Sequence, residues 1–199
     1  MLTPCPGVAS RGKLRIMCSV GMDSFTLHLT CTIRPAVEAD LPKLEWGGQY
    51  CHFRRLFRQT FEEQRAGRRL MLVADIGGYP IGQVFIQFAS SDSSFADGRH
   101  RGYLYSLRVM EPFQRQHIGT RLIEAAEQVL RERGYTWAVI AAAKDNPRAR
   151  SLYERLGYTV FSEDPGYWQY TDPEGIVQTV VEPCWVMEKR LIPQQEAIR

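Results

Sequence analysis

Residues 107–119 have the sequence LRVMEPFQRQHIG, a pattern that predicts a strand, a short turn and the start of a helix. Such a turn directs several consecutive backbone N–H groups at one point, where the helix dipole adds partial positive charge. That point favours an anion such as a diphosphate. Arg115 stands beside it and is placed to supply a charge-assisted hydrogen bond.

Residues 146–158, NPRARSLYERLGY, predict a short helix with both ends marked. Asn146 is a favourable N-cap, Pro147 takes the first helical position, where its missing N–H costs nothing, and Gly157 ends the helix. The apolar stripe of this helix consists of Ala149, Leu152, Tyr153 and Leu156.

Outward from these two stretches, the chain alternates between strands and helices. Apolar patterns predict strands at 27–33, 70–76, 81–88, 102–110, 135–143, 158–161 and 184–190. Helices are expected at 36–44, at 50–66, where Phe53, Phe57 and Phe61 are spaced at i, i+4, and from Ile118 to a stop at Gly134. Residues 89–101 are expected to form a loop, and residues 162–183 a loop or an irregular hairpin.

The composition is that of an ordinary globular protein. The chain has 199 residues, 44% hydrophobic and 24% charged, with 25 Lys and Arg against 22 Asp and Glu and a formal net charge of +3. This length predicts one domain, and the intermixed charges do not make the continuous basic surface of a dedicated nucleic-acid binder. The longest fully apolar stretch, 137–143, is far shorter than the roughly 20 residues that cross a bilayer. Neither nucleic acid nor a membrane is an expected partner.

The five cysteines stand at positions 5, 18, 31, 51 and 184, with no Cys-x-x-Cys pair among them. An odd number without that spacing argues against a disulfide framework and against a zinc cluster. The four histidines are scattered without ligand spacing, so no metal is expected. Reduced thiols favour a cytoplasmic location.

The N-terminal residues differ from the rest. Residues 1–22 carry Arg11, Lys13 and Arg15 but no acidic residue, and the opening residues 4–7, PCPG, show no apolar period. We interpret residues 1–26 as an N-terminal extension that is either disordered or precedes the true start, with Met17 or Met22 as that start. The folded domain is expected to span residues 27–192, followed by a tail over residues 193–199.

At its two motifs the sequence resembles the GNAT superfamily of N-acetyltransferases, whose pyrophosphate loop is written R/Q-x-x-G-x-G/A. Residues 114–119 match with one departure, because His117 stands where the first Gly is usual. The family's later motif, an Asn, an Ala and then Leu-Tyr-x-x-Leu-Gly-Tyr, matches from Asn146 to Tyr158 without a gap. The resemblance covers roughly residues 32–191. It implies an α/β (α+β) fold: a mixed, mainly antiparallel sheet of about seven strands flanked by helices, with a splayed parallel strand pair forming the cofactor cleft.

The resemblance further implies transfer of an acetyl group from acetyl-CoA to a primary amine by direct attack in a ternary complex. The splayed strands would be 103–110 and 135–143, with the first pairing its backbone with the pantetheine arm. The implied cofactor-binding residues are Leu107, Arg108, Val109, Gln114, Arg115, Gln116, His117, Ile118, Gly119, Thr120 and Asn146.

Tyr153 occupies the position from which the family's tyrosine points at the coenzyme sulfur, and a phenol there can protonate the departing thiolate. The other interpretation is a core tyrosine on the apolar stripe of its helix. The residues do not identify the base that takes the proton of the amine. Glu45, Asp92, Glu111 and Glu163 are candidates only.

The acceptor is not readable from the sequence. Residues 46–64, 89–101 and 162–183 are the segments expected to choose it, and Tyr167, Trp168 and Tyr170 either line an acceptor pocket or pack in the core. A small-molecule amine is favoured slightly over a protein amine. The alternative functions are a non-catalytic acyl-CoA-binding sensor or regulatory module and an RNA- or ribosome-associated protein that uses the arginines of residues 50–69 and its N-terminal tail. A homodimer is compatible with the family.

Overall fold

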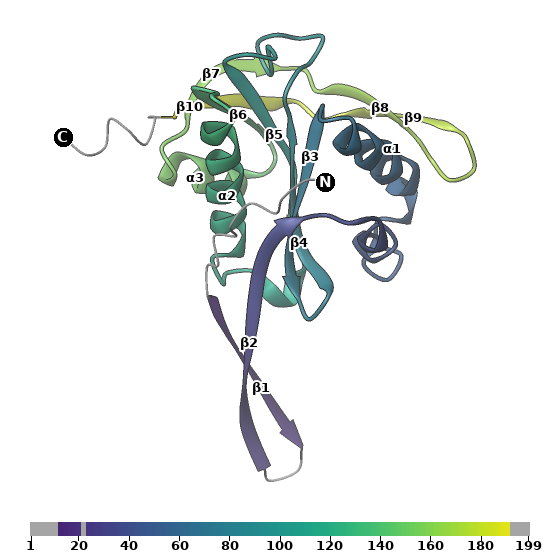
Figure 1. Ribbon diagram of the computed structural model, residues 1–199, viewed down its shortest axis with the longest axis vertical. Coiled ribbons are helices and arrows are strands. Elements are labelled where there is room, and N and C mark those ends of the chain that lie inside the picture. The colour runs from purple at the N-terminus through teal and green to yellow at the C-terminus, as the bar shows by residue number, and fades with distance from the viewer. Residues whose placement is uncertain (1–11, 21–22, 192–199) are drawn as a thin grey trace, which may run out of the picture.

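The computed structural model describes residues 12–20 and 23–191. They form a sheet of eight strands, a separate two-stranded hairpin and three α-helices (Figure 1). The sheet has the strand order β1-β2-β3-β4-β5-β6-β10-β7. Its strands are β1 (Gly12–Val20), β2 (Asp23–Pro35), β3 (Arg69–Ile76), β4 (Tyr79–Gln87), β5 (Arg101–Val109), β6 (Trp137–Ala143), β7 (Thr159–Asp164) and β10 (Cys184–Arg190).

The hairpin and the helices complete the fold. The hairpin pairs β8 (Tyr167–Thr171) with β9 (Val177–Val181). The α-helices are α1 (Arg54–Arg65), α2 (Ile118–Glu132) and α3 (Pro147–Arg155). Four short 3-10 turns are η1 (Glu38–Asp40), η2 (Lys43–Glu45), η3 (Cys51–Phe53) and η4 (Glu111–Phe113).

The sheet is mixed and mainly antiparallel, as predicted. Among the described strands, β5 and β6 form the one parallel pair. β2 pairs with β3 from Thr32 to Pro35, whereas its earlier residues pair with β1. The body of the sheet therefore has the predicted seven strands, and the β1–β2 hairpin projects from it (Figure 1).

The domain boundaries stay a prediction. β1 begins at Gly12, inside the segment assigned to the N-terminal extension, and pairs throughout with β2. Residues 1–11 and the predicted tail over 193–199 lie outside the described residues. None of the helices in the described ranges has the length and apolar character to cross a membrane.

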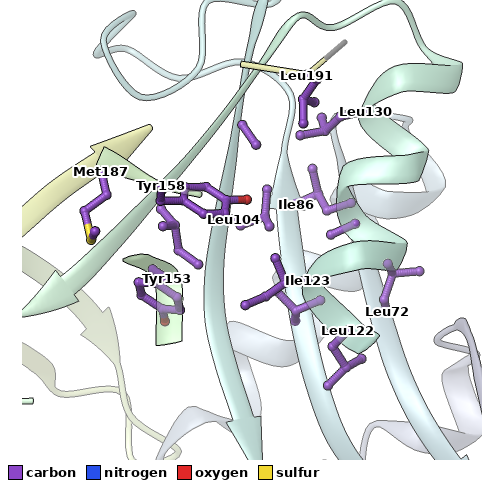
Figure 2. Close-up of a cluster of buried hydrophobic side chains, with 14 of the residues drawn as sticks. Leu72, Ile86, Leu104, Leu122, Ile123, Leu130, Tyr153, Tyr158, Met187 and Leu191 are labelled. Carbon is purple, nitrogen blue, oxygen red and sulfur yellow. The ribbon is translucent and has the colours of Figure 1, made fainter. Parts of the chain in front are cut away.

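Two hydrophobic clusters cover the two faces of the sheet. Side chains alternate along a strand, and in β3 Leu72 and Ala74 belong to one cluster while Met71 and Val73 belong to the other. The first cluster packs against α2, and we call it the α2 cluster. Leu122, Ile123 and Leu130 of α2 point toward the sheet in Figure 2. Burial on both faces explains why residues 70–74 of β3 form a continuous apolar run and why β4 is buried from Pro80 to Ile86.

The second cluster lies under α1, and it confirms the predicted amphipathic helix. Phe57 is almost fully buried and meets Phe85 of β4 edge to face, with ring centroids 6.2 Å apart. Phe53 is buried too, but it ends the 3-10 turn η3 rather than lying inside α1. The helix is therefore shorter at its start than the predicted 50–66.

Two expected elements take a different form. The short helix predicted at 36–44 is replaced by η1 and η2, because Pro42 between them has no N–H and cannot continue a helix. Residues 162–183, left open between a loop and an irregular hairpin, form the regular β8–β9 hairpin and the end of β7.

Glu127 of α2 ties three elements together inside the core. Its side chain is almost fully buried and accepts hydrogen bonds from Lys189 Nζ of β10 at 2.8 Å and from the Tyr158 hydroxyl, after α3, at 3.0 Å. Arg131 forms a third contact at 2.9 Å. Burial and the neighbouring Glu127 carboxylate raise the pKa of Tyr158 well above its ordinary value.

Glu127→Ala is expected to lower the free energy of unfolding by about 2 kcal/mol, because it leaves the buried Tyr158 hydroxyl and two partly buried cations without their shared acceptor. The matched control is Glu124→Ala, which removes an exposed i, i+3 pair with Arg121 and should change the free energy by less than about 0.5 kcal/mol. Chemical denaturation of both variants measures the difference. Equal effects would show that the Glu127 network does not hold the core.

Candidate functional site

The parallel strands β5 and β6 separate halfway along their length. They pair from Arg101 with Trp137 to Leu104 with Ile140, and no further. β6 then continues beside β10 as far as Ala143, while β5 stays paired with β4 as far as Val109. The edge of β5 after Leu104 therefore has no strand partner on the β6 side, and the predicted splayed pair is present.

A β-bulge lies in the free part of β5. Its register with β4 shifts between the pairs Gln83–Arg108 and Phe85–Tyr105, so that Ser106 and Leu107 lie opposite Val84 alone. Ser106 has a φ of 55°, which is uncommon for a residue other than glycine. A bulge re-aims the side chains that follow it. Leu107 and Val109 pack against the α2 cluster, and Arg108 between them faces the α1 side of the sheet.

A cavity of about 510 Å³ opens at this edge of β5. The predicted cofactor residues that line it are Leu107, Arg108, Val109, Gln114, Arg115, His117, Ile118, Gly119, Thr120 and Asn146, which leaves out only Gln116. Further lining residues, which the sequence analysis did not name, are Phe113, Arg148, Ala149, Leu152 and Arg155. The charged residues of this lining are arginines, with no Asp or Glu, so the cavity favours an anion.

The turn before α2 presents an unusual run of free donors. From Arg115 to Thr120, no backbone N–H reaches a protein acceptor within the described chain, and Arg121 is the first to do so, with His117 O at 3.0 Å. Arg115 and His117 have φ values of 62° and 60°. A turn with left-handed residues before a helix N-terminus forms a concave anion site. His117 thus adopts the backbone conformation for which glycine is the usual residue.

Helix α3 forms the other wall of the cavity, and its start is as predicted. The Asn146 side chain accepts a hydrogen bond from Ala149 N at 3.1 Å, and Pro147 follows at the first helical position. The cap uses only the side-chain oxygen of Asn146, so its amide N–H groups stay free for a ligand.

Tyr153 lies deeper than the cavity lining. Its side chain is 5% exposed, its ring centroid is 6.2 Å from that of Tyr158, and it belongs to the α2 cluster. Figure 2 shows its hydroxyl directed away from Tyr158, and within the described chain that hydroxyl has no hydrogen-bond partner. Burial raises the pKa of Tyr153 to about 12, so the phenol stays protonated at neutral pH.

On the opposite face of β5, aromatic side chains gather between α1 and the β8–β9 hairpin. Phe53 contacts Tyr170 and Trp168 of β8, with ring centroids 4.8 Å and 6.0 Å away. Tyr105 of β5 belongs to the same cluster. Tyr167, in contrast, is 72% exposed, so only two of the three late aromatics face the domain.

Comparison with known proteins identifies the family of this chain. Residues 36–158 match the acetyltransferase (GNAT) family. The chain belongs to this family. The structure of Ard1 from Thermoplasma volcanium is similar to this fold, with a TM-score of 0.63 and 17% sequence identity. The match covers 81% of this chain and 98% of the Ard1 chain. The structure of Arabidopsis thaliana NAA60 in complex with acetyl-CoA also matches, with a TM-score of 0.60 and 17% sequence identity. The match covers 81% of this chain and 99% of the NAA60 chain. At these identities the likeness shows the fold alone.

Two curated relatives match shorter stretches of the chain. N-alpha-acetyltransferase 30 of Schizosaccharomyces pombe is 38% identical over 58 residues, which are 29% of this chain and 39% of that protein. Mycothiol acetyltransferase of Propionibacterium freudenreichii is 32% identical over 98 residues, which are 49% of this chain and 30% of that protein. The chain thus matches well under half the length of either relative.

Most candidate bases of this GNAT domain are held by other groups. Glu45 accepts two hydrogen bonds from Arg54, at 2.6 and 2.8 Å, which lower its pKa, and Glu163 pairs with Lys144. Asp92 accepts hydrogen bonds from the hydroxyl and the N–H of Ser94, which lower its pKa. Glu111 lies exposed in η4, outside the cavity lining. The base stays unassigned.

The arginines of residues 50–69 do not form one free basic face. Arg54 binds Glu45, Arg69 pairs with Glu63, and Arg55 donates to the Pro173 carbonyl at 3.0 Å. Arg58, Arg65 and Arg68 are exposed and have no acidic partner within the described chain, which fits a solvated helix face. These contacts do not test the RNA-binding alternative.

The left-handed turn at His117 can be tested by substitution. His117→Gly keeps the backbone conformation and should leave the affinity for acetyl-CoA within about twofold. His117→Val should weaken it at least about tenfold, because a β-branched residue is a genuine outlier at positive φ and would reshape the turn. Isothermal titration measures both affinities. Equal weakening in the two variants would mean that the imidazole, rather than the turn, contributes to binding.

Proposed function

We propose that this chain transfers an acetyl group from acetyl-CoA to a primary amine by direct attack in a ternary complex. The observation that carries the proposal is that the unpaired edge of β5 and the N–H-rich turn before α2 open into one cavity. An extended ligand with an anionic end and an amide-containing arm matches both features. Acetyl-CoA has that chemistry, and it would supply an activated acetyl thioester.

The residues of the turn suit the diphosphate. The free N–H groups between Arg115 and Thr120 point into a site where the dipole of α2 adds positive charge. Arg115, Arg148 and Arg155 line the same cavity, and no carboxylate there opposes an anion. Charge-assisted hydrogen bonds of this kind are the strong ones in phosphate binding.

The edge of β5 suits the amide arm and the reacting carbonyl. Leu107 and Val109 line the cavity where β5 has no strand partner on the β6 side. In our proposal, their main-chain groups bind the arm as an added strand would, and one N–H stabilises the oxygen that becomes negative during attack. A backbone donor aimed at such an oxygen is worth about 3 kcal/mol. In the same proposal, the free side-chain N–H groups of Asn146 donate hydrogen bonds to the amide arm of the coenzyme.

Tyr153 is the proposed proton donor to the departing thiolate. Its raised pKa keeps it protonated, and its hydroxyl has no competing partner within the described chain. Tyr153 is buried and is not among the residues that line the cavity, so the thioester end of the coenzyme would have to reach beyond that lining to meet its hydroxyl. This burial, with the unassigned base, also favours the second candidate function, an acyl-CoA-binding sensor that does no chemistry.

The proposed acceptor is a small amine. Trp168 and Tyr170 pack onto Phe53 and close the α1 side of β5 with aromatic rings, which suits a compact acceptor better than an extended chain. The names of the two curated relatives, one an N-alpha-acetyltransferase and the other a mycothiol acetyltransferase, do not agree on one acceptor.

Tyr153→Phe keeps the ring and removes the proton. We expect kcat to fall about 100-fold, the lower end of the effect of a general acid, while the affinity for acetyl-CoA stays near its original value. Tyr158→Phe is the matched control, because its hydroxyl binds Glu127 and should affect stability but not kcat. A free-thiol assay and isothermal titration measure the two quantities. An unchanged kcat in Tyr153→Phe would remove this residue from the acid role.

Gly119→Glu tests the coenzyme site. It places a carboxylate against the proposed diphosphate position and should weaken acetyl-CoA binding at least about 100-fold, a repulsion of a few kcal/mol at short range. Gly119→Ala is the matched control, because its added Cβ would lie 3.9 Å from Leu152 and Val109 side-chain carbons, an ordinary contact. Titration of both variants gives the comparison. Undiminished affinity in Gly119→Glu would place the coenzyme elsewhere.

A further inference from the structure

Arg108 stands where the coenzyme cavity meets the aromatic cluster on the other face of β5. It lines the cavity beside Leu107 and Val109, and its guanidinium lies over the rings of Tyr50 and Phe53, 4.7 and 5.0 Å from their centroids. These rings hold the planar group from the α1 side. The proposed thioester position is set by its two sequence neighbours, so Arg108 lies next to the reacting carbonyl.

Arg108 differs from the other partly buried arginines of the described chain, because it has no acidic partner. Arg34, Arg69, Arg101, Arg131 and Arg150 all form ion pairs with Asp or Glu. Arg108 forms no ion pair, and its one side-chain hydrogen bond within the described chain is from Nη1 to Ser106 Oγ, at 3.5 Å. Glu182 interacts with Arg108 only by longer-range electrostatics, because the two side chains are too far apart to form an ion pair.

The missing partner implies a bound anion. Burial lowers the pKa of Arg108, but a guanidinium stays charged in proteins. A desolvated charge without a partner is costly, and buried charges are generally paired. Apart from the 3.5 Å contact with Ser106 Oγ, the guanidinium N–H groups have no hydrogen-bond partner within the described chain, and this planar fork matches a carboxylate with two parallel hydrogen bonds.

The anion that fits this place belongs to the acceptor. The diphosphate has its own site at the start of α2, on the helical side of the sheet, whereas the guanidinium lies on the aromatic side. An acceptor amine must approach the thioester from outside the coenzyme cavity, and it would meet Arg108 first. A polycationic acceptor would be repelled there, while a carboxylate on the acceptor would offset the arginine charge.

We infer that Arg108 binds a carboxylate of the acceptor, so that the substrate class is small primary amines that carry a carboxylate near the amine, as amino acids do. This inference rests on the proposed acetyl transfer and specifies its acceptor. Arg108 is thereby a specificity-determining residue, and Tyr50 and Phe53 are positioning residues that hold its guanidinium.

The test compares acceptors that differ only in the carboxylate. Wild-type protein with acetyl-CoA is assayed by free-thiol release against a set of α-amino acids, each beside its own carboxamide, with spermidine as a polycationic acceptor. We expect kcat/KM for the amino acid to exceed that for its carboxamide about 100-fold, the range of a charge-assisted hydrogen-bonded pair. Arg108→Met should abolish this ratio, chiefly by raising the acceptor KM. Arg108→Lys, which keeps the charge without the fork, should retain part of it.

The outcomes separate the inference from the proposed function. Turnover of amines with no preference for the carboxylate, a preference for spermidine, or a preference that persists in Arg108→Met would overturn the inference and leave acetyl transfer standing. The absence of thiol release with every amine, despite acetyl-CoA binding, would overturn the proposed transfer and this inference with it. Acetyl-CoA titration reports whether each variant folds. Where Arg108→Met does not, the wild-type ratio still tests the substrate class, and an unchanged ratio in Arg108→Lys would overturn the role of the Arg108 fork.

Discussion

The end of the hydrogen bonding between β5 and β6 is the constraint on which the site depends. Beyond Leu104 and Ile140, β6 takes β10 as its partner and β5 keeps only β4, so one edge of β5 faces open space. Unpaired backbone groups inside a domain require a partner, because an unmet buried donor or acceptor is costly. A ligand that pairs with the strand meets this requirement. The cavity opens at this separation, and the bulge at Ser106, which lies in the β4–β5 pairing, turns Arg108 to the opposite face of the same strand.

The two sides of β5 then perform different tasks. On the helical side, the turn before α2 gathers free N–H groups and arginines around one part of the cavity, and its left-handed residues are the strain that this geometry requires. On the α1 side, Tyr50 and Phe53 hold the guanidinium of Arg108 against the sheet. The alternation of side chains along β5 is what allows one strand to serve both sides.

The sequence predicts the parts of this arrangement that depend on local chemistry. The Asn146 cap, the apolar runs of β3 and β4 and the amphipathic character of α1 and α2 appear in the structure as their patterns indicate. The turn at residues 114–119 is predicted as well, because its motif fixes a backbone shape, and only His117 obscures it.

Features that depend on distant residues could not be predicted. Nothing in the composition of β5 marks a bulge at Ser106, which arises from its pairing with β4. The depth of Tyr153 is set by how α3 packs against the α2 cluster, so periodicity alone could not separate a cavity-lining role from a core role. The isolation of Arg108 is visible only once the positions of all nearby acids are known.

The proposed function depends most directly on the binding of acetyl-CoA to the cavity between β5 and α3. Isothermal titration of the purified chain with acetyl-CoA, followed in the same sample by a free-thiol assay with amines, measures binding and transfer together. The account predicts one molecule of acetyl-CoA bound per chain with micromolar affinity, and thiol release when a suitable amine is added. The absence of any binding would contradict it, because neither the free N–H groups of the turn nor the open edge of β5 would then have the proposed ligand.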